Sequence, residues 1–168
     1  KIAQSPKAAK LYCAPGNPGM ARYAECVNLA ANDLDGLLAF ARSERIDLTV
    51  VGPEDPLAMG IVDRFQAAGL RIWGPSAAAA RLEASKAFAK DVMKRHGIPT
   101  SKYAAFDDAA AAIEYIEKEG APIVVKADGL AAGKGVTVAA TVPEAVTAVR
   151  GTMLERTFGE AGANVIIE

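Results

Sequence analysis

Short apolar segments alternate with longer amphipathic segments through most of this chain, and this alternation constrains the fold more than any other feature. Strands separated by helices pair in parallel, because each crossover helix returns the chain to the same end of the sheet. The pattern therefore predicts an α/β protein whose first half is Rossmann-like. The expected strands of this half cover residues 10–14, 28–30, 47–52 and 71–73.

Two helices are expected between these strands. Their apolar residues recur at the i, i+3, i+4, i+7 spacing of one buried helix face. They are Leu34, Leu37, Leu38 and Ala41 in the first helix, and Leu57, Ile61, Val62 and Phe65 in the second. Gly69 is placed to end the second helix. Trp73 falls in the last strand, where we expect it to pack in the core, and the residues before position 10 read as the end of an amphipathic helix.

The character of the sequence changes after Gly74-Pro75. Ser76 and Ser85 each precede a helical pattern, and the second pattern stops at Gly97. A smaller α+β unit follows, with strands expected at 102–106, 122–127, 135–140 and 164–168 and helices at 107–119 and from Pro143 onward. We therefore divide the chain into a Rossmann-like domain (1–75), a helical connection (76–98) and an α+β subdomain (99–168).

Charge and cysteine content exclude several classes of function. Lys and Arg number 19 against 20 Asp and Glu, so no overall field attracts nucleic acid or an anionic membrane. Cys13 and Cys26 form neither a disulfide framework nor a CxxC metal pattern. We expect a cytoplasmic protein with reduced thiols and small-molecule partners.

A glycine-rich segment, KADGLAAGKGV at residues 126–136, separates two expected strands. A Walker A loop would need Gly at the position of Asp128 and Ser or Thr at that of Gly135. The dinucleotide-binding fingerprint also fails, because a strand and not a helix follows Gly135. The segment indicates a different kind of phosphate-binding loop.

The residue types of this loop suit an anion. Gly129, Gly133 and Gly135 let backbone N–H groups approach a phosphate, while Lys126 and Lys134 supply positive charge. The alternative is a plain hairpin connection with Lys134 projecting into water.

This segment closely resembles the nucleotide-binding hairpin of the glycinamide ribonucleotide synthetase family, which is part of the ATP-grasp superfamily. The resemblance implies that Lys126 reaches the α- and β-phosphates of ATP and that the loop carrying Lys134 closes over the transferred phosphate. It also implies that the loop residues Asp128, Gly129, Gly133 and Gly135 contact the nucleotide. Within EASKAFAK at residues 83–90, Lys86 matches a second phosphate-facing lysine; without the resemblance it would read as a solvated helix lysine.

Two segments of the first half resemble the same family at the site of a phosphoribosyl substrate. In APGNPG at 14–19, the candidate residues are Gly16, Asn17, Pro18 and Gly19; the alternative is a simple turn. In VGPEDPL at 51–57, Pro53 and Glu54 follow a strand, and Glu54 is expected to accept hydrogen bonds from ribose hydroxyls. Its alternative role is to favour the N-terminus of the next helix.

The terminal VIIE segment resembles the start of the hinge that contacts adenine in ATP-grasp enzymes. Glu168 is the residue implied in that contact, and the alternative is an edge-strand carboxylate. His96, the only histidine, is expected to sit at a helix end without a catalytic role.

The resemblance implies an ATP-dependent ligase that joins glycine to 5-phosphoribosylamine through glycyl phosphate. Lys126 and Lys134 would act on phosphate without a covalent nucleophile, and Mg²⁺ or Mn²⁺ would be held by ligands downstream of residue 168. From its two ends we expect the chain to be a cut piece, lacking its first strand, and inactive alone. Two alternatives stay open: another ATP-grasp ligase, biotin-carboxylase-like or a formate-dependent purine enzyme, and a noncatalytic nucleotide-binding module.

Overall fold

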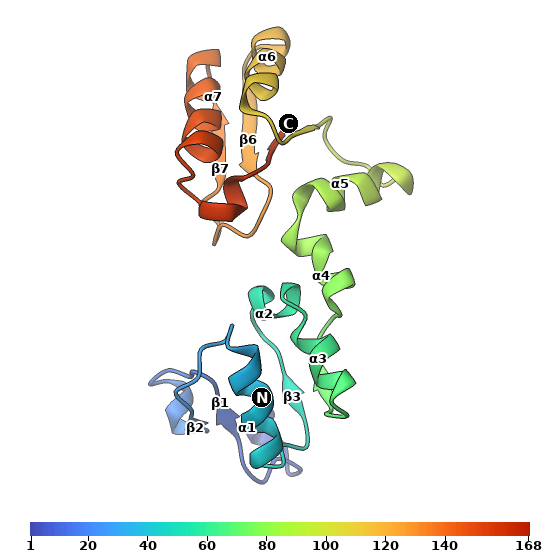
Figure 1. Ribbon diagram of the computed structural model, residues 1–168, viewed down its shortest axis with the longest axis vertical. Helices are drawn as coiled ribbons and strands as arrows, with labels where there is room; N and C mark the ends of the chain where they lie inside the picture. The colour runs from blue at the N-terminus through green and yellow to red at the C-terminus, as the bar shows by residue number, and fades with distance from the viewer. The chain divides into compact units, whose positions relative to one another are not determined.

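The computed structural model describes residues 1–168, which divide into two compact units, Lys1–Ala80 and Arg81–Glu168. Each unit contains both strands and helices (Figure 1). None of the helices is both long and apolar enough to cross a membrane. The three-part division at residues 75 and 98 stays a prediction.

The first unit contains two small parallel sheets, as expected for a Rossmann-like half. Its elements are η1 (Ile2–Gln4), β1 (Tyr12–Cys13), η2 (Met20–Arg22), β2 (Glu25–Cys26), α1 (Leu34–Ser43), β3 (Thr49–Val50), α2 (Glu54–Ala58), α3 (Ile61–Ala67) and β4 (Ile72–Trp73). Strand β1 pairs with β2, and β3 pairs with β4. Helix α4 (Ala77–Ala84) runs from this unit into the second.

The core of the first unit is built from the helix faces that the spacing predicted. Asp33 begins α1 by accepting a hydrogen bond from the Gly36 N–H at 2.9 Å. Leu34 and Ala41 of α1 are buried with Val62 and Phe65 of α3. Burial of side chains as large as Val62 and Phe65 contributes about 1.5–3 kcal/mol each.

Three expectations for this unit are wrong. Strand β2 lies before residues 28–30, because the Leu29 N–H turns back to the Val27 carbonyl at 2.8 Å and ends the ladder. The expected single helix is divided into α2 and α3 at Gly60, whose φ of 87° is left-handed. Residues before position 10 form only η1, which buries no side chain.

The expectation that Trp73 packs in the core is also wrong. Neighbouring side chains in a strand point to opposite faces, and Ile72 is the residue that packs against the core. Trp73 therefore points outward and is 67% exposed.

The second unit is a four-stranded antiparallel sheet with helices. Its elements are α5 (Lys86–Arg95), β5 (Ala104–Phe106), α6 (Ala109–Glu119), β6 (Ile123–Ala127), β7 (Val136–Ala139), α7 (Val142–Val149), the π-helical turn η3 (Arg150–Leu154), η4 (Gly159–Gly162) and β8 (Val165–Ile167). The strand order is β5-β8-β6-β7. Asp108 caps α6 and Thr141 caps α7.

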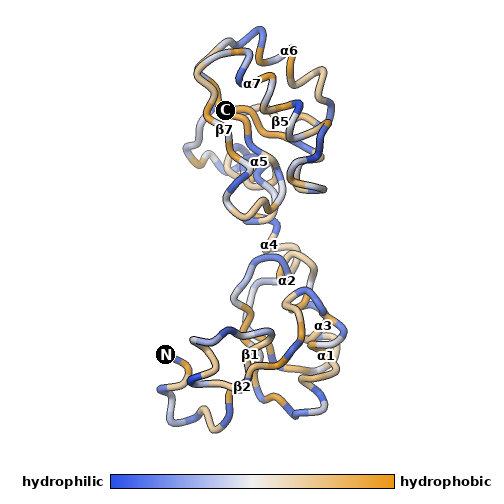
Figure 2. The backbone as a smooth tube through the Cα atoms, turned by 90° about the vertical axis from the view of Figure 1, so that its left-hand side faces the viewer, coloured by the Kyte–Doolittle hydropathy of each residue, from blue (hydrophilic) through white to orange (hydrophobic).

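Helices α6 and α7 contact each other and the sheet (Figure 1). Their core includes Ile116 and Val149, which are fully buried, and Ile123 and Val125 of β6. Figure 2 shows that residues along the strands of this unit are hydrophobic and that several of its loops contain hydrophilic residues. Because β6 alternates, Lys126 lies on the face opposite Val125, away from this core.

Candidate nucleotide-binding site

A hairpin formed by β6 and β7 carries the glycine-rich loop. The ladder ends where Lys126 pairs with Val136. At the tip of the loop, the Lys134 N–H donates to the Ala131 carbonyl at 2.9 Å, and the two residues between them, Ala132 and Gly133, both have positive φ. These are the features of a type I′ turn. The turn leaves Lys134 exposed and without an ion pair.

The other two glycines hold the base of the loop. The Gly129 N–H donates to the Ala161 carbonyl at 3.1 Å, and a Cβ at Gly129 would lie 2.7 Å from the Ala161 Cα. A Cβ at Gly135 would lie 2.9 Å from that of Ala127. Both positions thus require the absence of a side chain, so the loop has a fixed base and an exposed tip.

Asp128 fastens the start of α5 to this loop. Its carboxylate accepts hydrogen bonds from the Ala87 N–H at 2.7 Å and from the Ser85 hydroxyl at 3.1 Å. The Ser85 hydroxyl in turn accepts from the Phe88 N–H at 3.1 Å. Two N–H groups of the first helical turn are thereby satisfied, and a negative charge lies at the positive end of the helix.

Lys86 is brought to the same loop by this contact. Its Nζ donates to the carbonyl oxygens of Asp128 at 3.3 Å and Gly129 at 3.1 Å. Lys86 and Lys126, which are 40 positions apart in the sequence, thus both lie beside the end of β6. Two lysine side chains at one strand end are groups that can donate charge-assisted hydrogen bonds to phosphate oxygens.

Removing the Asp128 carboxylate is expected to destabilise α5. Asp128→Ala leaves the Ala87 N–H and the Ser85 hydroxyl without their acceptor, which should lower the free energy of unfolding by about 1–2 kcal/mol. Urea denaturation of the full-length protein measures this loss. Asp107→Ala is the control, since Asp107 is exposed and has no hydrogen-bond partner. Equal stability of the two variants would contradict the capping role.

Glu168 lies at the end of β8 and pairs with two lysines. Its Oε2 is 2.6 Å from the Lys126 Nζ, and its Oε1 is 2.7 Å from the Lys90 Nζ. Burial raises the pKa of the Glu168 carboxyl, but the hydrogen bonds from Lys126 and Lys90 outweigh it and hold that pKa below its ordinary value. The carboxylate therefore stays charged near neutral pH.

Lys90 was not among the residues expected from the sequence. It lies four residues after Lys86 on α5, and this i, i+4 spacing places both lysines on one helix face. That spacing was the available signal, but solvated helices also carry lysines at such intervals.

The candidate phosphoribosyl segments lie in the first unit. Gly16, with a φ of 80°, leads into a turn in which the Asn17 Oδ1 accepts hydrogen bonds from the N–H groups of Gly19 and Met20. Pro18 is exposed between them. This segment follows the carboxyl end of β1.

Pro53 and Glu54 follow β3, at the start of α2. Both are exposed, and Glu54 is the first residue of the helix. No hydrogen bond or ion pair joins this segment to the Gly16–Gly19 turn. The structure therefore places each segment at a strand end and brings neither into contact with a charged partner.

The structure contains no cluster of three or more His, Cys, Asp or Glu side chains that could hold a metal ion. The acidic groups at the hairpin, Asp128 and Glu168, are already engaged by a helix N-terminus and by lysines. These residues consequently do not fit a Mg²⁺ site by themselves.

Solved structures share this fold. A crystal structure of phosphoribosylamine–glycine ligase from Thermotoga maritima matches with a TM-score of 0.74 at 24% identity, covering 99% of this chain and 39% of that one. A biotin carboxylase from Campylobacter jejuni matches with a TM-score of 0.74 at 21% identity, over 94% of this chain and 38% of that one. These likenesses show the fold, a Rossmann-like domain followed by an α+β domain, and the match of residues 84–168 to an ATP-grasp domain model defines a protein of the ATP-grasp class.

Sequence comparison narrows the class to one family. Residues 84–168 match the model described as the ATP-grasp (A) domain of phosphoribosylglycinamide synthetase, and residues 1–83 match its N domain. The chain belongs to the phosphoribosylglycinamide synthetase family. It is 60% identical to phosphoribosylamine–glycine ligase of Xanthomonas campestris pv. campestris over its whole length, and it spans 39% of the length of that relative.

Proposed function

We propose that these residues serve an enzyme that ligates glycine to 5-phosphoribosylamine at the expense of ATP. The observation that carries the proposal is the convergence of Lys86 and Lys126 on the glycine-rich hairpin. The names of the relatives and the match to the family model support the choice of substrates.

In this reaction, a carboxylate oxygen of glycine attacks the γ-phosphorus of ATP, and ADP leaves. The amino nitrogen of phosphoribosylamine then attacks the acyl carbon of glycyl phosphate. Phosphate leaves with the bonding electrons, the nitrogen loses a proton, and glycinamide ribonucleotide is formed. No protein nucleophile takes part, so the protein contributes positioning and electrostatic stabilisation.

The second unit would hold ATP. Lys86 and Lys126 would pair with the α- and β-phosphates, and Lys134 at the loop tip would meet the phosphoryl group that is transferred. Gly129, Gly133 and Gly135 would supply the close backbone approach, with Asp128 beside them.

The remaining assignments follow the same proposal. Glu168 would contact the adenine, and the Gly16–Gly19 turn with Pro53 and Glu54 would hold the phosphoribosyl group. Mg²⁺ would need acidic ligands that these 168 residues do not provide, and no step here depends on it. Glycine and phosphoribosylamine are the proposed partners, in the cytoplasm.

The test is phosphate release by the full-length protein that contains these residues. It is measured with ATP, Mg²⁺ and freshly generated phosphoribosylamine, with glycine present or omitted. The proposal expects release that requires both glycine and phosphoribosylamine. Release that is indifferent to glycine, or that bicarbonate or formate supports equally, would refute it, and ATP binding without any release would indicate a noncatalytic module.

A further inference from the structure

Lys90 is a nearly buried lysine that contacts Glu168, which is also nearly buried, and two exposed hydroxyl residues, Thr100 and Ser101. Its side chain is 11% exposed, against 25% for Lys126. The Lys90 Nζ donates to the Thr100 and Ser101 hydroxyls, each at 2.7 Å, and contacts the Glu168 Oε1 at 2.7 Å. An ammonium group has three N–H donors, so every donor of Lys90 has an acceptor.

Glu168 is shared unequally between its two lysines. One carboxylate oxygen contacts Lys90, whose other two partners are the uncharged hydroxyls of Thr100 and Ser101. The other oxygen faces Lys126, which has no other hydrogen-bond partner and is the more exposed of the two lysines. Lys126 is therefore the partner that is free to turn toward a ligand.

Movement of Lys126 away from Glu168 would be energetically unfavourable if Glu168 had no other partner. The Glu168 side chain is 12% exposed, and a carboxylate that is left buried and unpaired is strongly unfavourable. With Lys126 as its only counterion, Glu168 would hold that lysine and compete with the phosphates of ATP. Lys90 removes this competition, because it stays on Glu168 when Lys126 leaves.

We propose that Lys90 is a positioning residue that retains Glu168 and thereby releases Lys126 to bind the phosphates of ATP. This inference rests on the proposed nucleotide-binding role of Lys126. It assigns to Lys90 a function in ligand affinity, beyond fixing the chain at Thr100 and Ser101.

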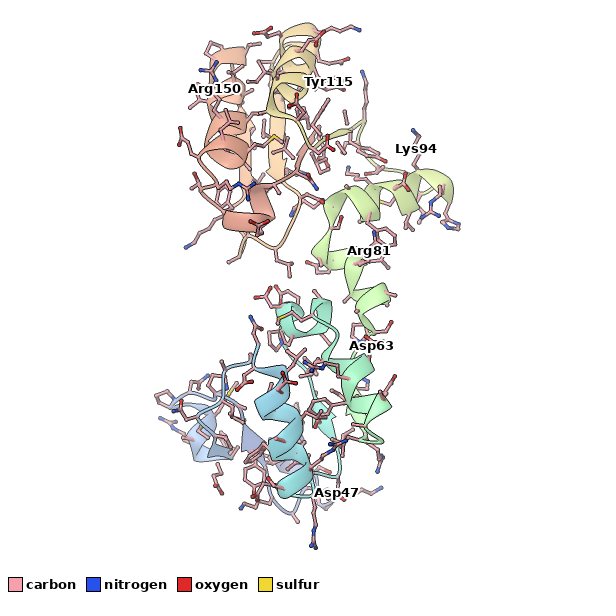
Figure 3. The ribbon with its side chains drawn as sticks, viewed as in Figure 1. Asp47, Asp63, Arg81, Lys94, Tyr115 and Arg150 are labelled. Atoms are coloured by element: carbon pink, nitrogen blue, oxygen red, sulfur yellow. The ribbon has the colours of Figure 1, made fainter.

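Lys90→Met in the full-length protein is expected to weaken ATP binding by about tenfold or more, since Lys126 is then held by Glu168. Lys94→Met is the matched control, one turn further along α5, where the side chain is exposed (Figure 3). ATP affinity of each variant is measured by titration calorimetry. Lys90→Gln, which keeps donors for the two hydroxyls but lacks the charge, should also weaken binding and serves if Lys90→Met does not fold.

The double variant Lys90→Met/Glu168→Gln separates this role from a structural one. Glu168→Gln alone is the reference, because Glu168 is also the residue proposed to contact adenine. A neutral amide at position 168 no longer holds Lys126, so Lys90→Met should weaken ATP binding several-fold less in the Glu168→Gln background than in the wild type. Equal losses in the two backgrounds, or normal ATP affinity of both Lys90 variants, would overturn the inference. Lys126→Ala separates the failure of this inference from the failure of the proposed function. Normal ATP affinity of Lys126→Ala would refute the phosphate-binding role of Lys126. Weakened ATP affinity of Lys126→Ala together with unaffected Lys90 variants would refute only the role of Lys90.

Discussion

Lys126→Ala in the full-length protein is expected to lower kcat/KM for ATP by roughly 10²- to 10³-fold. Lys126 extends from the end of β6, on the sheet face opposite the hydrophobic core, at the point where the chain leaves the strand for the glycine-rich loop. A positioned charge that stabilises a transferring phosphoryl group typically accounts for an effect of this size. Steady-state kinetics with varied ATP measure it.

Lys118→Ala is the control for this prediction. Lys118 is an exposed residue of α6 with no ion pair, so its loss changes the net charge by the same amount without touching the hairpin. Its kinetics should match those of the wild type. A Lys126→Ala enzyme with unchanged kcat/KM would show that the phosphates bind elsewhere.

Gly129→Ala is expected to destabilise the second unit by about 1–3 kcal/mol, because the added methyl group has no space. The Cβ would lie 2.7 Å from the Ala161 Cα and 2.9 Å from its Cβ. The Ala161 Cα is a backbone atom, so no side-chain rotation can relieve the contact and either η4 or the loop must shift. That shift would strain the hydrogen bond from the Gly129 N–H to the Ala161 carbonyl. Denaturant unfolding measures the loss of stability.

Gly151→Ala is the matched control in the same unit. A Cβ there would have its nearest neighbours at 3.9 Å, which is ordinary contact, and its φ is not in the left-handed region. Alanine in a helical position should leave the free energy of unfolding unchanged or slightly higher. If Gly129→Ala were as stable as Gly151→Ala, the close packing of the loop base would be refuted.

Helices of this protein were predictable because their signals are local. Ser85, Asp108 and Thr141 each cap a helix within four residues, so sequence neighbours alone define where α5, α6 and α7 begin. The β6–β7 hairpin was predictable for the same reason: two apolar runs flank a short glycine-rich loop. The division of the helix at Gly60 was not predictable, because a single glycine inside an apolar helical pattern is often tolerated.

The contacts that build the site were not predictable, because they join distant parts of the chain. Asp128 accepts from the N-terminus of α5, 41 positions earlier, and Lys90 meets Glu168 from the opposite end of the unit. Pattern and spacing give the face of a helix or strand but not its partner. Trp73 shows the same limit, since alternation alone does not indicate which of two faces of a short strand is covered.

Hydrogen exchange of the full-length protein, with and without ATP and Mg²⁺, tests the central claim most directly. The account predicts that ATP slows amide exchange in the 128–135 loop and in the first turn of α5, which is joined to the loop by the hydrogen bond from the Ala87 N–H to the Asp128 carboxylate. The exposed outer turns of α6 should serve as an internal reference and exchange at the same rate in both samples. ATP binding that leaves exchange of the loop unchanged, or that protects only segments outside the hairpin and α5, would contradict the account.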